Sequence, residues 1–382
     1  MERDRSAPVV GLNVPAQIGM PVEEIATPAL IIELDQFEKN VKTLKDFIET
    51  HGVRLRAHAK THKSADVARY QMSQGGACGV CCQKVSEAQA LVSAGIDDVL
   101  VSNQVVDKRQ IRHLAEMAKS ARVMVCVDDA DNVDDLARAA QAAGVEIGCL
   151  VEIDVGAGRC GVRPGREAAV LAGRIAQARG LKFAGLQAYQ GSAQHKAEFE
   201  TRKALIGEAV QMVRETVDLL EAEGLGCEIV AGAGTGTFAM EAQSGLYNEL
   251  QCGSYVFMDA DYQRILDEDG KPVSMFGNSL FIVTSVMSKT RPGFAVCDAG
   301  LKAQSADSGL PRVHGREGVT YIKWSDEHGV LEDPGDTLKL GDKVWLVPGH
   351  CDPTCNLYDT YVGVRDGKVE CLWPVTARGR VF

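Results

Sequence analysis

The sequence lacks an excess of positive charge. Its 382 residues include 41 lysines and arginines against 52 aspartates and glutamates, which gives a net charge of −11. Proteins that bind nucleic acid usually present a basic face to the phosphates, and attraction to an anionic membrane needs the same sign of charge. The composition therefore argues against nucleic acid and against a membrane surface as partners.

Long apolar runs are missing as well. No stretch approaches the roughly 18 apolar residues of a membrane helix, and the opening MERDRSAPVV contains no apolar signal core. The 12 cysteines are scattered, and in a large chain without such a leader they are expected to be reduced. We therefore expect a cytoplasmic protein with free thiols. A structural zinc site made from Cys78, Cys81 and Cys82 with Cys351 and Cys355 is the alternative.

What the sequence does contain is a regular alternation of strand-like and helix-like segments. Hydrophobic residues make up 45% of the chain, enough for the cores of two domains. Most strand-like runs are separated by amphipathic stretches of helical length, so a parallel sheet is expected. Eight runs follow one another: RLRAHAK (54–60), CGVCCQ (78–83), DVLVSN (98–103), RVMVCVD (122–128), IGCLVEID (147–154), FAGLQAY (183–189), EIVAGAG (228–234) and ELQCGSY (249–255).

Eight such units in succession predict a TIM-type (β/α)8 barrel. An open, doubly wound sheet is the alternative, and a G-x-G-x-x-G dinucleotide loop would favour it. The nearest candidate is GAGTG at 232–236, which follows the seventh strand and lacks the acidic residue expected about 20 positions later. The barrel is therefore the preferred fold.

The predicted secondary structure changes at about residue 270. Helical periodicity fades there, short β-rich segments follow, and RDGK near the end of the chain predicts a hairpin turn. We expect a leader and strand at 1–35, the barrel at 36–268 and a β domain at 269–382. The first strand-like run, TPALIIELD at 27–35, is expected to join the β domain.

A polar strand face marks the segment RAHAKTHK, at 56–63. By the period of two, Arg54, Arg56, His58 and Lys60 share one face of the first predicted barrel strand. Strands of a parallel barrel are normally apolar on both faces, so groups inside the barrel must match these charges. Lys60 would end the strand at the carboxyl end of the barrel, where a lysine can attack a carbonyl group. A solvated lysine paired with a neighbouring carboxylate is the alternative.

A second polar constellation is PGHCDPTCN, which follows a predicted strand near the end of the chain. His350 and Asp352 are two residues apart and can point the same way. A nitrogen and a carboxylate together suit Mn²⁺ or a similar divalent cation, with waters completing the shell. A turn aspartate that caps its own backbone is the alternative.

RAHAKTHK resembles the lysine segment of the pyridoxal 5′-phosphate (PLP) enzymes of the alanine-racemase-like fold, in particular the D-threonine aldolase and 3-hydroxy-D-aspartate aldolase group. The resemblance implies fold type III, a PLP-binding β/α barrel with a C-terminal β domain, and a homodimer. It also implies that Lys60 forms the Schiff base with PLP, while His58 and His62 shape the site. The matching segments cover nearly the whole chain: TPALIIELD, CCQKVSEA, VEIDVGAGRCGV, GLQAYQGSAQH, GAGTGT, NELQCGSYVFMDADY, DAGLKAQS, SDEHGV and HCDPTCN.

The phosphate of that cofactor needs hydroxyls and backbone N–H groups that can approach it closely. Barrels often bind phosphate after the seventh and eighth strands. Ordinary glycine turns are the alternative for both of these loops. The candidate phosphate ligands are Thr235, Gly236 and Thr237 in the first loop and Gly253 and Ser254 in the second.

The resemblance assigns four further residues to the cofactor pocket. Arg159, in GAGRCGV, would reach the ring hydroxyl, and Gln83 and Tyr189 would line the pocket. Gln251 takes the place of an arginine that faces the pyridine nitrogen in the racemases. A neutral partner there would leave that nitrogen less protonated and change how electrons are withdrawn. A buried amide satisfied by the backbone is the alternative for Gln251.

In the resembling aldolases the pair His350 and Asp352 is the metal site, whereas the related dehydratases carry His-x-Cys. The aspartate therefore favours an aldolase that uses Mn²⁺, with Mg²⁺ or Co²⁺ as alternatives. The implied reaction cleaves 3-hydroxy-D-aspartate to glycine and glyoxylate, and also D-threonine to glycine and acetaldehyde. His195, in GSAQH, is the candidate base that takes the hydroxyl proton. A hydroxide held by the metal, with a structural His195, is the alternative.

Other functions stay open at this point. D-threonine is the alternative main substrate, and a D-3-hydroxyaspartate dehydratase, a D-serine dehydratase or a racemase is the second class of enzyme. A non-catalytic PLP carrier built on the barrel alone is a third possibility, although a carrier needs no metal pair. A substrate with a β-carboxylate needs an extra cation in the pocket, for which Arg312 and Arg316 are the candidates.

Overall fold

The computed structural model describes residues 8–382, which form two compact units. The barrel unit contains residues 41–255, 264–273 and 379–382. The β unit contains the described residues up to 40, together with 256–263 and 274–378. Residues 1–7 of the predicted leader lie outside the described residues.

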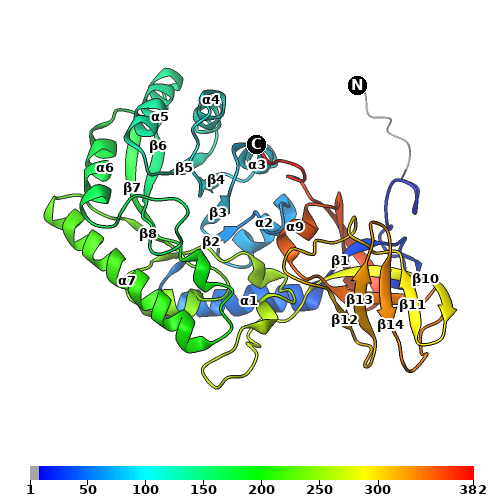
Figure 1. Ribbon diagram of the computed structural model, residues 1–382. Helices are drawn as coiled ribbons and strands as arrows, with labels where there is room; N and C mark the ends of the chain where they lie inside the picture. The colour runs from blue at the N-terminus through cyan, green and yellow to red at the C-terminus, as the bar shows by residue number, and fades with distance from the viewer. Residues whose placement is uncertain (1–7) are drawn as a thin grey trace. The chain divides into compact units, whose positions relative to one another are not determined.

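The barrel unit is built on eight parallel strands that close on themselves. Figure 1 shows helices covering the outside of these strands. The strands are β2 (Arg54–His58), β3 (Gly79–Cys82), β4 (Asp98–Val101), β5 (Arg122–Val127), β6 (Ile147–Glu152), β7 (Leu181–Gln187), β8 (Ile229–Gly232) and β9 (Glu249–Leu250). The helices are α1 (Leu34–His51), α2 (Ala65–Ser73), α3 (Val85–Ser93), α4 (Lys108–Met117), α5 (Ala130–Ala143), α6 (Arg166–Gln177), η2 (Gly191–Ala193), α7 (Phe199–Ala222), α8 (Phe238–Gln243) and η3 (Ser254–Val256).

The predicted (β/α)8 barrel is confirmed, and the open sheet is excluded because β2 pairs with both β3 and β9. Several strands end earlier than the sequence pattern predicts. β2 ends at His58 rather than at Lys60, and β9 contains only two residues. The polar groups beyond these ends therefore lie in loops, where their positions are set by side-chain contacts rather than by the strand period.

The barrel has two apolar layers, because successive residues of a strand face opposite sides. The outer layer packs against the helices and includes Cys82, Val99 and Val101. All 12 cysteines are free thiols, and no group of three or more His, Cys, Asp or Glu side chains within residues 8–382 can hold a metal ion. The zinc alternative therefore finds no cluster in the described chain. The inner layer consists of Cys81, Leu100, Met124, Cys126, Leu150, Ala184, Ile229 and Ala231.

The outer helices begin and end at residues with clear physical roles. The side chain of Asp107 accepts hydrogen bonds from two N–H groups in the first turn of α4, and Asp129 does the same for α5. Gly144 follows α5 in the left-handed conformation, with φ of 69°, which a glycine adopts without steric cost. Within the described part of the chain, no helix is both long enough and apolar enough to cross a membrane.

The β unit contains a nine-stranded sheet whose main order is β13-β14-β11-β10-β1-β16-β17. β15 pairs with β10 on one side and with β12 on the other. The strands are β1 (Ala29–Glu33), β10 (Leu280–Arg291), β11 (Phe294–Cys297), β12 (Arg312–His314), β13 (Thr320–Trp324), β14 (Gly329–Glu332), β15 (Lys343–Val347), β16 (Thr360–Arg365) and β17 (Lys368–Pro374). Its helical segments are η1 (Val22–Glu24), η4 (Tyr262–Arg264) and α9 (Cys351–Cys355).

Two sequence patterns correspond to elements of this sheet. β1, the first strand of the chain, lies between β10 and β16 and pairs antiparallel with the former and parallel with the latter. The RDGK turn joins β16 to β17, with Arg365 opposite Lys368. Asp366 and Gly367 have φ values of 49° and 71°, as a two-residue hairpin turn of type I′ requires.

Candidate functional site

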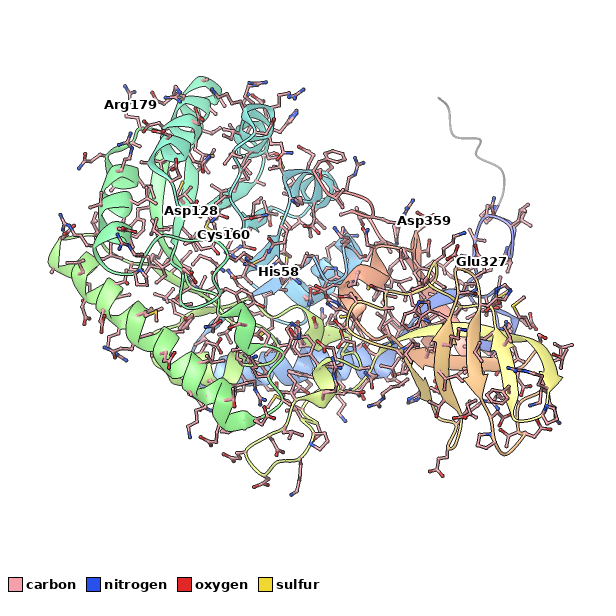
Figure 2. The ribbon with its side chains drawn as sticks, in the orientation of Figure 1. His58, Asp128, Cys160, Arg179, Glu327 and Asp359 are labelled. Carbon is pink, nitrogen blue, oxygen red and sulfur yellow. The ribbon has the colours of Figure 1, made fainter. Side chains whose placement is uncertain are left out.

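The carboxyl ends of β2, β3 and β4 bring three polar side chains together. His58 ends β2 (Figure 2), and its Nε2 lies 3.0 Å from Nε2 of Gln83 and 3.3 Å from Oγ of Ser102. The Gln83 amide also donates to Ser102 Oγ at 3.2 Å. This polar cluster lines the inside of the barrel end at which enzymes of this architecture carry their reactive groups.

Lys60 lies two residues beyond β2, in the turn that follows the strand. The backbone N–H of Thr61 bonds to the carbonyl of His58 at 3.3 Å, and that of Lys63 bonds to the carbonyl of Ala59 at 2.7 Å. This turn ends the strand earlier than the alternation of polar and apolar residues predicts. Ala59 and Thr61 are buried while Lys60 is partly exposed, so the Lys60 side chain lies at the carboxyl end of the barrel within reach of solvent.

The second lysine of the segment has a different environment. Lys63 Nζ lies 3.0 Å from Oε1 of Glu87, which is completely buried, and Glu87 Oε2 accepts the N–H of Gln83 at 2.7 Å. Lys63 has a positive φ of 53°, which is unusual for a residue other than glycine. Lys63 therefore ties the turn after β2 to α3.

The loops after β8 and β9 approach neighbouring chain segments closely. A Cβ atom at Gly234 would come within 2.5 Å of Gln194 Oε1, and one at Gly253 within 2.4 Å of Thr61 Oγ1. Ala233 is held at a positive φ of 69°. Thr235 Oγ1 accepts the N–H of Tyr255 at 3.0 Å, which joins the two loops. A side chain at position 234 or 253 would force a neighbouring group to shift, so the loops form a tight cradle.

The five candidate phosphate ligands differ in how their hydrogen-bond donors are used. The N–H of Gly236 donates to Gln194 Oε1 at 3.0 Å, and the N–H of Thr237 to the carbonyl of Gly234 at 3.2 Å. Among the described residues, no acceptor is found for the N–H groups of Thr235 and Gly253. Thr235 and Gly253 therefore have donors to offer an anion in this arrangement. Ser254, the fifth candidate, is buried at the start of η3.

Carboxylates fold the loop after β6 that carries the predicted Arg159. Asp154 Oδ1 accepts the N–H groups of Gly156 and Gly158, each at 3.0 Å. Asp128, directly after β5, accepts the N–H of Gly161 at 2.9 Å and is labelled in Figure 2. The loop is therefore fixed by charge-assisted hydrogen bonds at both of its ends.

Arg159 itself lies beside Tyr189, with its guanidinium carbon 5.8 Å from the centre of the ring. Its Nη2 is 4.0 Å from Oε1 of Glu152, a carboxylate that also accepts the Gln104 amide at 2.6 Å. Burial raises the pKa of Glu152 above its ordinary value. Arg159 and Tyr189, two of the predicted pocket residues, are thus brought together.

Gln251 is a buried amide whose partner is another amide. It exchanges two hydrogen bonds with Gln187, at 2.8 Å each, and both side chains are almost fully buried. The partner is therefore a side chain and not the backbone that the alternative interpretation assumed. His195, the predicted base, lies in the irregular segment after η2 and is exposed, while the preceding Gln194 is completely buried.

The candidate metal pair lies in the β unit, where β15 leads into α9. His350 precedes α9 and Asp352 lies in its first turn. The Nδ1 of His350 is 2.7 Å from Oδ2 of Asp307, an arrangement in which a carboxylate orients the imidazole and leaves Nε2 for a metal. Partial burial raises the pKa of Asp307, but hydrogen bonds from His350 and Ser305 outweigh it and hold that pKa below its ordinary value. Because no group of three such side chains forms within residues 8–382, protein ligands alone do not complete a shell.

The two arginines considered for a substrate carboxylate also lie in the β unit. Arg316 is half-buried, with Nη1 3.7 Å from Asp342 and Nη2 donating to the carbonyl of Lys343 at 3.2 Å. Arg312 is exposed on β12. Arg316 is therefore already matched by groups of its own unit.

Comparison with known proteins bears on this geometry. Residues 32–261 match the model of the alanine racemase N-terminal domain, and residues 279–364 match that of a serine dehydratase domain. A 3-hydroxy-D-aspartate aldolase from Paracoccus denitrificans (strain Pd 1222) is 56% identical over 382 residues, which cover 99% of each chain. The chain belongs to the 3-hydroxy-D-aspartate aldolase and D-threonine aldolase family.

Two further members of this family extend the comparison. A D-threonine aldolase from Arthrobacter sp. is 44% identical over 372 residues, which cover 97% of each chain. The crystal structure of D-threonine aldolase from Filomicrobium marinum matches with a TM-score of 0.94 at 48% identity, covering 97% of this chain and 100% of that one. Membership of the aldolase family confirms the predicted enzyme class, a carbon–carbon lyase, together with the predicted fold.

Sequence reasoning missed three residues that support the candidate sites. Gln194 and Glu241 hold the loop after β8, and Asp307 contacts His350. Gln194 and Asp307 each lie more than 40 residues along the chain from the residue that they support, so no spacing in the sequence connects them. A buried glutamate in the segment that follows GAGTGT was the one signal within reach of the sequence, since a carboxylate in an otherwise apolar stretch needs a partner.

Proposed function

We propose that the protein is a PLP- and divalent-metal-dependent aldolase that cleaves D-3-hydroxy amino acids to glycine and an aldehyde. The substrate that we assign is 3-hydroxy-D-aspartate, which gives glycine and glyoxylate, with D-threonine as a second substrate that gives glycine and acetaldehyde. The observation that carries this assignment is the full-length relative at 56% identity, a 3-hydroxy-D-aspartate aldolase. The D-threonine aldolases of the family, at 44% and 48% identity, support the second substrate.

The residues at the carboxyl end of the barrel fit PLP. Lys60 is partly exposed in the turn after β2, where its amine can bind the cofactor aldehyde. The cradle at Gly234 and Gly253, together with the donors of Thr235, suits the phosphate group. Arg159 and Tyr189 are proposed to border the ring, and Gln251 to lie at its nitrogen. When bound, PLP supplies the electron sink that stabilises the carbanion left by cleavage.

The donor set of the β unit fits a divalent cation. His350 offers Nε2 because Asp307 engages Nδ1, and Asp352 offers a carboxylate. One nitrogen and one oxygen ligand suit Mn²⁺, and Mg²⁺ or Co²⁺ are alternatives. When bound, the metal lowers the pKa of the substrate hydroxyl as a Lewis acid. His195 is proposed to take the hydroxyl proton, and its exposure lets the imidazole exchange that proton with water.

Product analysis tests this proposal. Purified protein with PLP and Mn²⁺ is supplied with 3-hydroxy-D-aspartate, and D-threonine is run beside it. Glycine and glyoxylate are expected, and the relative rates decide between 3-hydroxy-D-aspartate and D-threonine as the main substrate. Oxaloacetate and ammonia would instead make the protein a dehydratase and would contradict the argument from Asp352.

A matched variant separates an enzyme from a PLP carrier. Asp352→Ala removes one proposed metal ligand and leaves the barrel unchanged. We expect loss of turnover with the absorption band of bound PLP retained. Unchanged turnover would remove the metal from the proposed mechanism.

Two statements about the whole protein complete the proposal. The free thiols and the acidic composition fit a cytoplasmic location. The family resemblance points to a homodimer, which light scattering on the purified protein would test against the 41.0 kDa of one chain.

A further inference from the structure

A chain of three buried side chains lies under the loop after β8. The Gln194 amide donates to Oγ1 of Thr237 at 2.7 Å, and the Thr237 hydroxyl donates to Oε1 of Glu241 at 2.8 Å. Gln194, Thr237 and Glu241 are 0%, 2% and 1% exposed. Oε1 of Gln194 also accepts the N–H of Gly236. These hydrogen bonds therefore join a buried carboxylate to Gly236 and Thr237, two of the candidate phosphate ligands.

The number of hydrogen atoms available among these three side chains decides whether Thr237 can donate a hydrogen bond to a phosphate. A hydroxyl has one hydrogen to donate and two lone pairs that accept. In the observed arrangement one lone pair takes the Gln194 amide and the hydrogen goes to Glu241. The N–H of Thr237 is also used, by the carbonyl of Gly234. While Glu241 is ionised, Thr237 therefore has no hydrogen for a phosphate oxygen.

A proton on Glu241 reverses the direction of this bond. The protonated carboxyl can donate to Oγ1 of Thr237, which then accepts from both Gln194 and Glu241. The hydroxyl hydrogen of Thr237 becomes free to point elsewhere. The protonation state of Glu241 thus decides whether this hydroxyl can serve an anion.

The surroundings of Glu241 favour the protonated form. Oε2 of Glu241 has no hydrogen-bond partner among residues 8–382, and no lysine or arginine is among the groups that shift the pKa of this carboxyl. Burial raises the pKa of Glu241 from 4.5 to about 7. The titratable groups that face it are Tyr247, before β9, and Cys252, after it, and burial raises the pKa of both, so they stay neutral at neutral pH.

We propose that Glu241 is a positioning residue that links binding of the cofactor phosphate to uptake of a proton, by releasing the Thr237 hydroxyl when Glu241 is protonated. This inference rests on the proposed use of PLP in the barrel. A bound phosphate dianion acts in the same direction, because a second negative charge nearby disfavours the ionised carboxylate. Affinity for the phosphate group therefore falls as the pH rises through the range in which Glu241 ionises.

The test uses ligands that cannot react with Lys60. Pyridoxamine 5′-phosphate and pyridoxamine both lack the aldehyde, so neither forms a covalent bond, and they differ only in the phosphate. Calorimetry measures the affinity of each for the cofactor-free full-length protein at about pH 6 and about pH 8.5. The native chain is compared with Glu241→Gln, which keeps a donor toward Thr237 and cannot ionise.

We expect the affinity of the native chain for pyridoxamine 5′-phosphate, relative to that of Glu241→Gln, to fall about tenfold between the two pH values. The same ratio for pyridoxamine should not change with pH. Thr237→Val is the matched control: adding Glu241→Gln to it should leave the pH dependence unaltered. Equal pH profiles of the native chain and Glu241→Gln would overturn the proposal.

A measurement on the native chain alone guards against misfolding of the variants. Near neutral pH, calorimetry in buffers of different ionisation enthalpy should show more protons taken up with pyridoxamine 5′-phosphate than with pyridoxamine. Equal uptake would contradict the inference. If pyridoxamine 5′-phosphate does not bind at all, the assignment of PLP to the barrel fails and this inference fails with it, whereas binding without the pH effect defeats the inference alone.

Discussion

In the middle of β2, Arg56 reaches carboxylates at the amino ends of β4 and β9, whereas at the carboxyl end of the same strand His58 meets an amide and a hydroxyl. Arg56 Nε is 2.8 Å from Glu249, its Nη1 is 2.6 Å from Asp98, and its side chain is 1% exposed. His58 contacts Gln83 and Ser102. One face of one strand thus carries an arginine matched by carboxylates toward one end of the barrel, and a histidine matched by an amide and a hydroxyl at the other.

This difference shows how a barrel can divide stability and chemistry along a single strand. Burial by itself lowers the pKa of Arg56, but Glu249 and Asp98 outweigh it and hold that pKa above its ordinary value. The amino end is therefore closed by charges that satisfy one another. At the carboxyl end of β2, the amide of Gln83 and the hydroxyl of Ser102 are neutral groups, which can exchange one partner for another at little cost when a ligand arrives. Active sites of (β/α)8 barrels lie at this second end.

Replacing Lys60 should give the largest effect on activity and little effect on the fold. Lys60→Ala removes the amine at the carboxyl end while leaving the ion pairs at the amino end intact. We expect the turnover number to fall at least about a thousandfold, the scale seen when a covalent catalyst is removed. Steady-state kinetics and the absorption spectrum of bound PLP measure the loss. A melting temperature that falls sharply in the same variant would show that the carboxyl end also stabilises the barrel.

Removing Arg56 should do the reverse. Arg56→Met leaves Glu249 and Asp98 without their buried partner, and breaking a buried ion pair in this way costs about 3–5 kcal/mol in the free energy of unfolding. Urea denaturation measures the change. The double variant Arg56→Met/Glu249→Leu is the control, because removing charge on both sides should recover part of the loss. A destabilisation below about 1 kcal/mol in the single variant would contradict the proposal that the Arg56 ion pairs stabilise the barrel more than the groups around His58 do.

Much of the amino end was within reach of the sequence. The period of two along β2 predicts that groups inside the barrel must match the charges on one face of the strand, and Glu249 and Asp98 do so for Arg56. Which carboxylates do so was out of reach, because Glu249 is 193 residues from Arg56 along the chain. The strand count and the hairpin at 365–368 were predicted for a related reason, since both depend on local pattern.

The carboxyl end was predicted less well, because loops have no period. The segment GSAQH directs attention to His195, yet the structure exposes that side chain and buries the neighbouring Gln194 against the loop after β8. The predicted strand 249–255 contains two strand residues, because Thr235 and Tyr255 join the loops immediately beyond them. Contacts between distant loops fix these positions, and no spacing in the sequence records them.

Glu241 is a further ionisable group in the barrel, in α8 after β8. Its pKa is raised in the folded chain, so its contribution to stability is fully present below the unfolded pKa and is lost as the pH rises through the folded pKa of about 7. We expect the free energy of unfolding of the native chain to fall, relative to Glu241→Gln, by up to about 3 kcal/mol between about pH 5 and about pH 8. Urea denaturation of the cofactor-free protein at several pH values measures this difference. Parallel curves would mean that the carboxyl group finds a compensating partner.

In the β unit, the carboxylate of Asp307 contacts the candidate metal ligand His350. Asp307 is half-exposed and contacts His350, so we expect it to orient a ligand rather than to stabilise a core. Asp307→Asn should weaken the binding of Mn²⁺ about 10–100-fold, the usual effect of losing such a partner. Electron paramagnetic resonance of free Mn²⁺ measures the affinity without any need for turnover. Unchanged binding would show that the contact with His350 is an ordinary surface ion pair.

The smallest expected effect tests the carboxyl end of β2 directly. Ser102→Ala removes one hydroxyl from the cluster but leaves the Gln83 amide 3.0 Å from His58, so no charge is left unmatched. We expect the free energy of unfolding to fall by about 1 kcal/mol or less, in contrast to the loss for Arg56→Met. Urea denaturation of both variants under one set of conditions makes the comparison. A loss as large as that of Arg56→Met would mean that the carboxyl end is built as rigidly as the amino end, and ligand binding there would then require another source of adaptability.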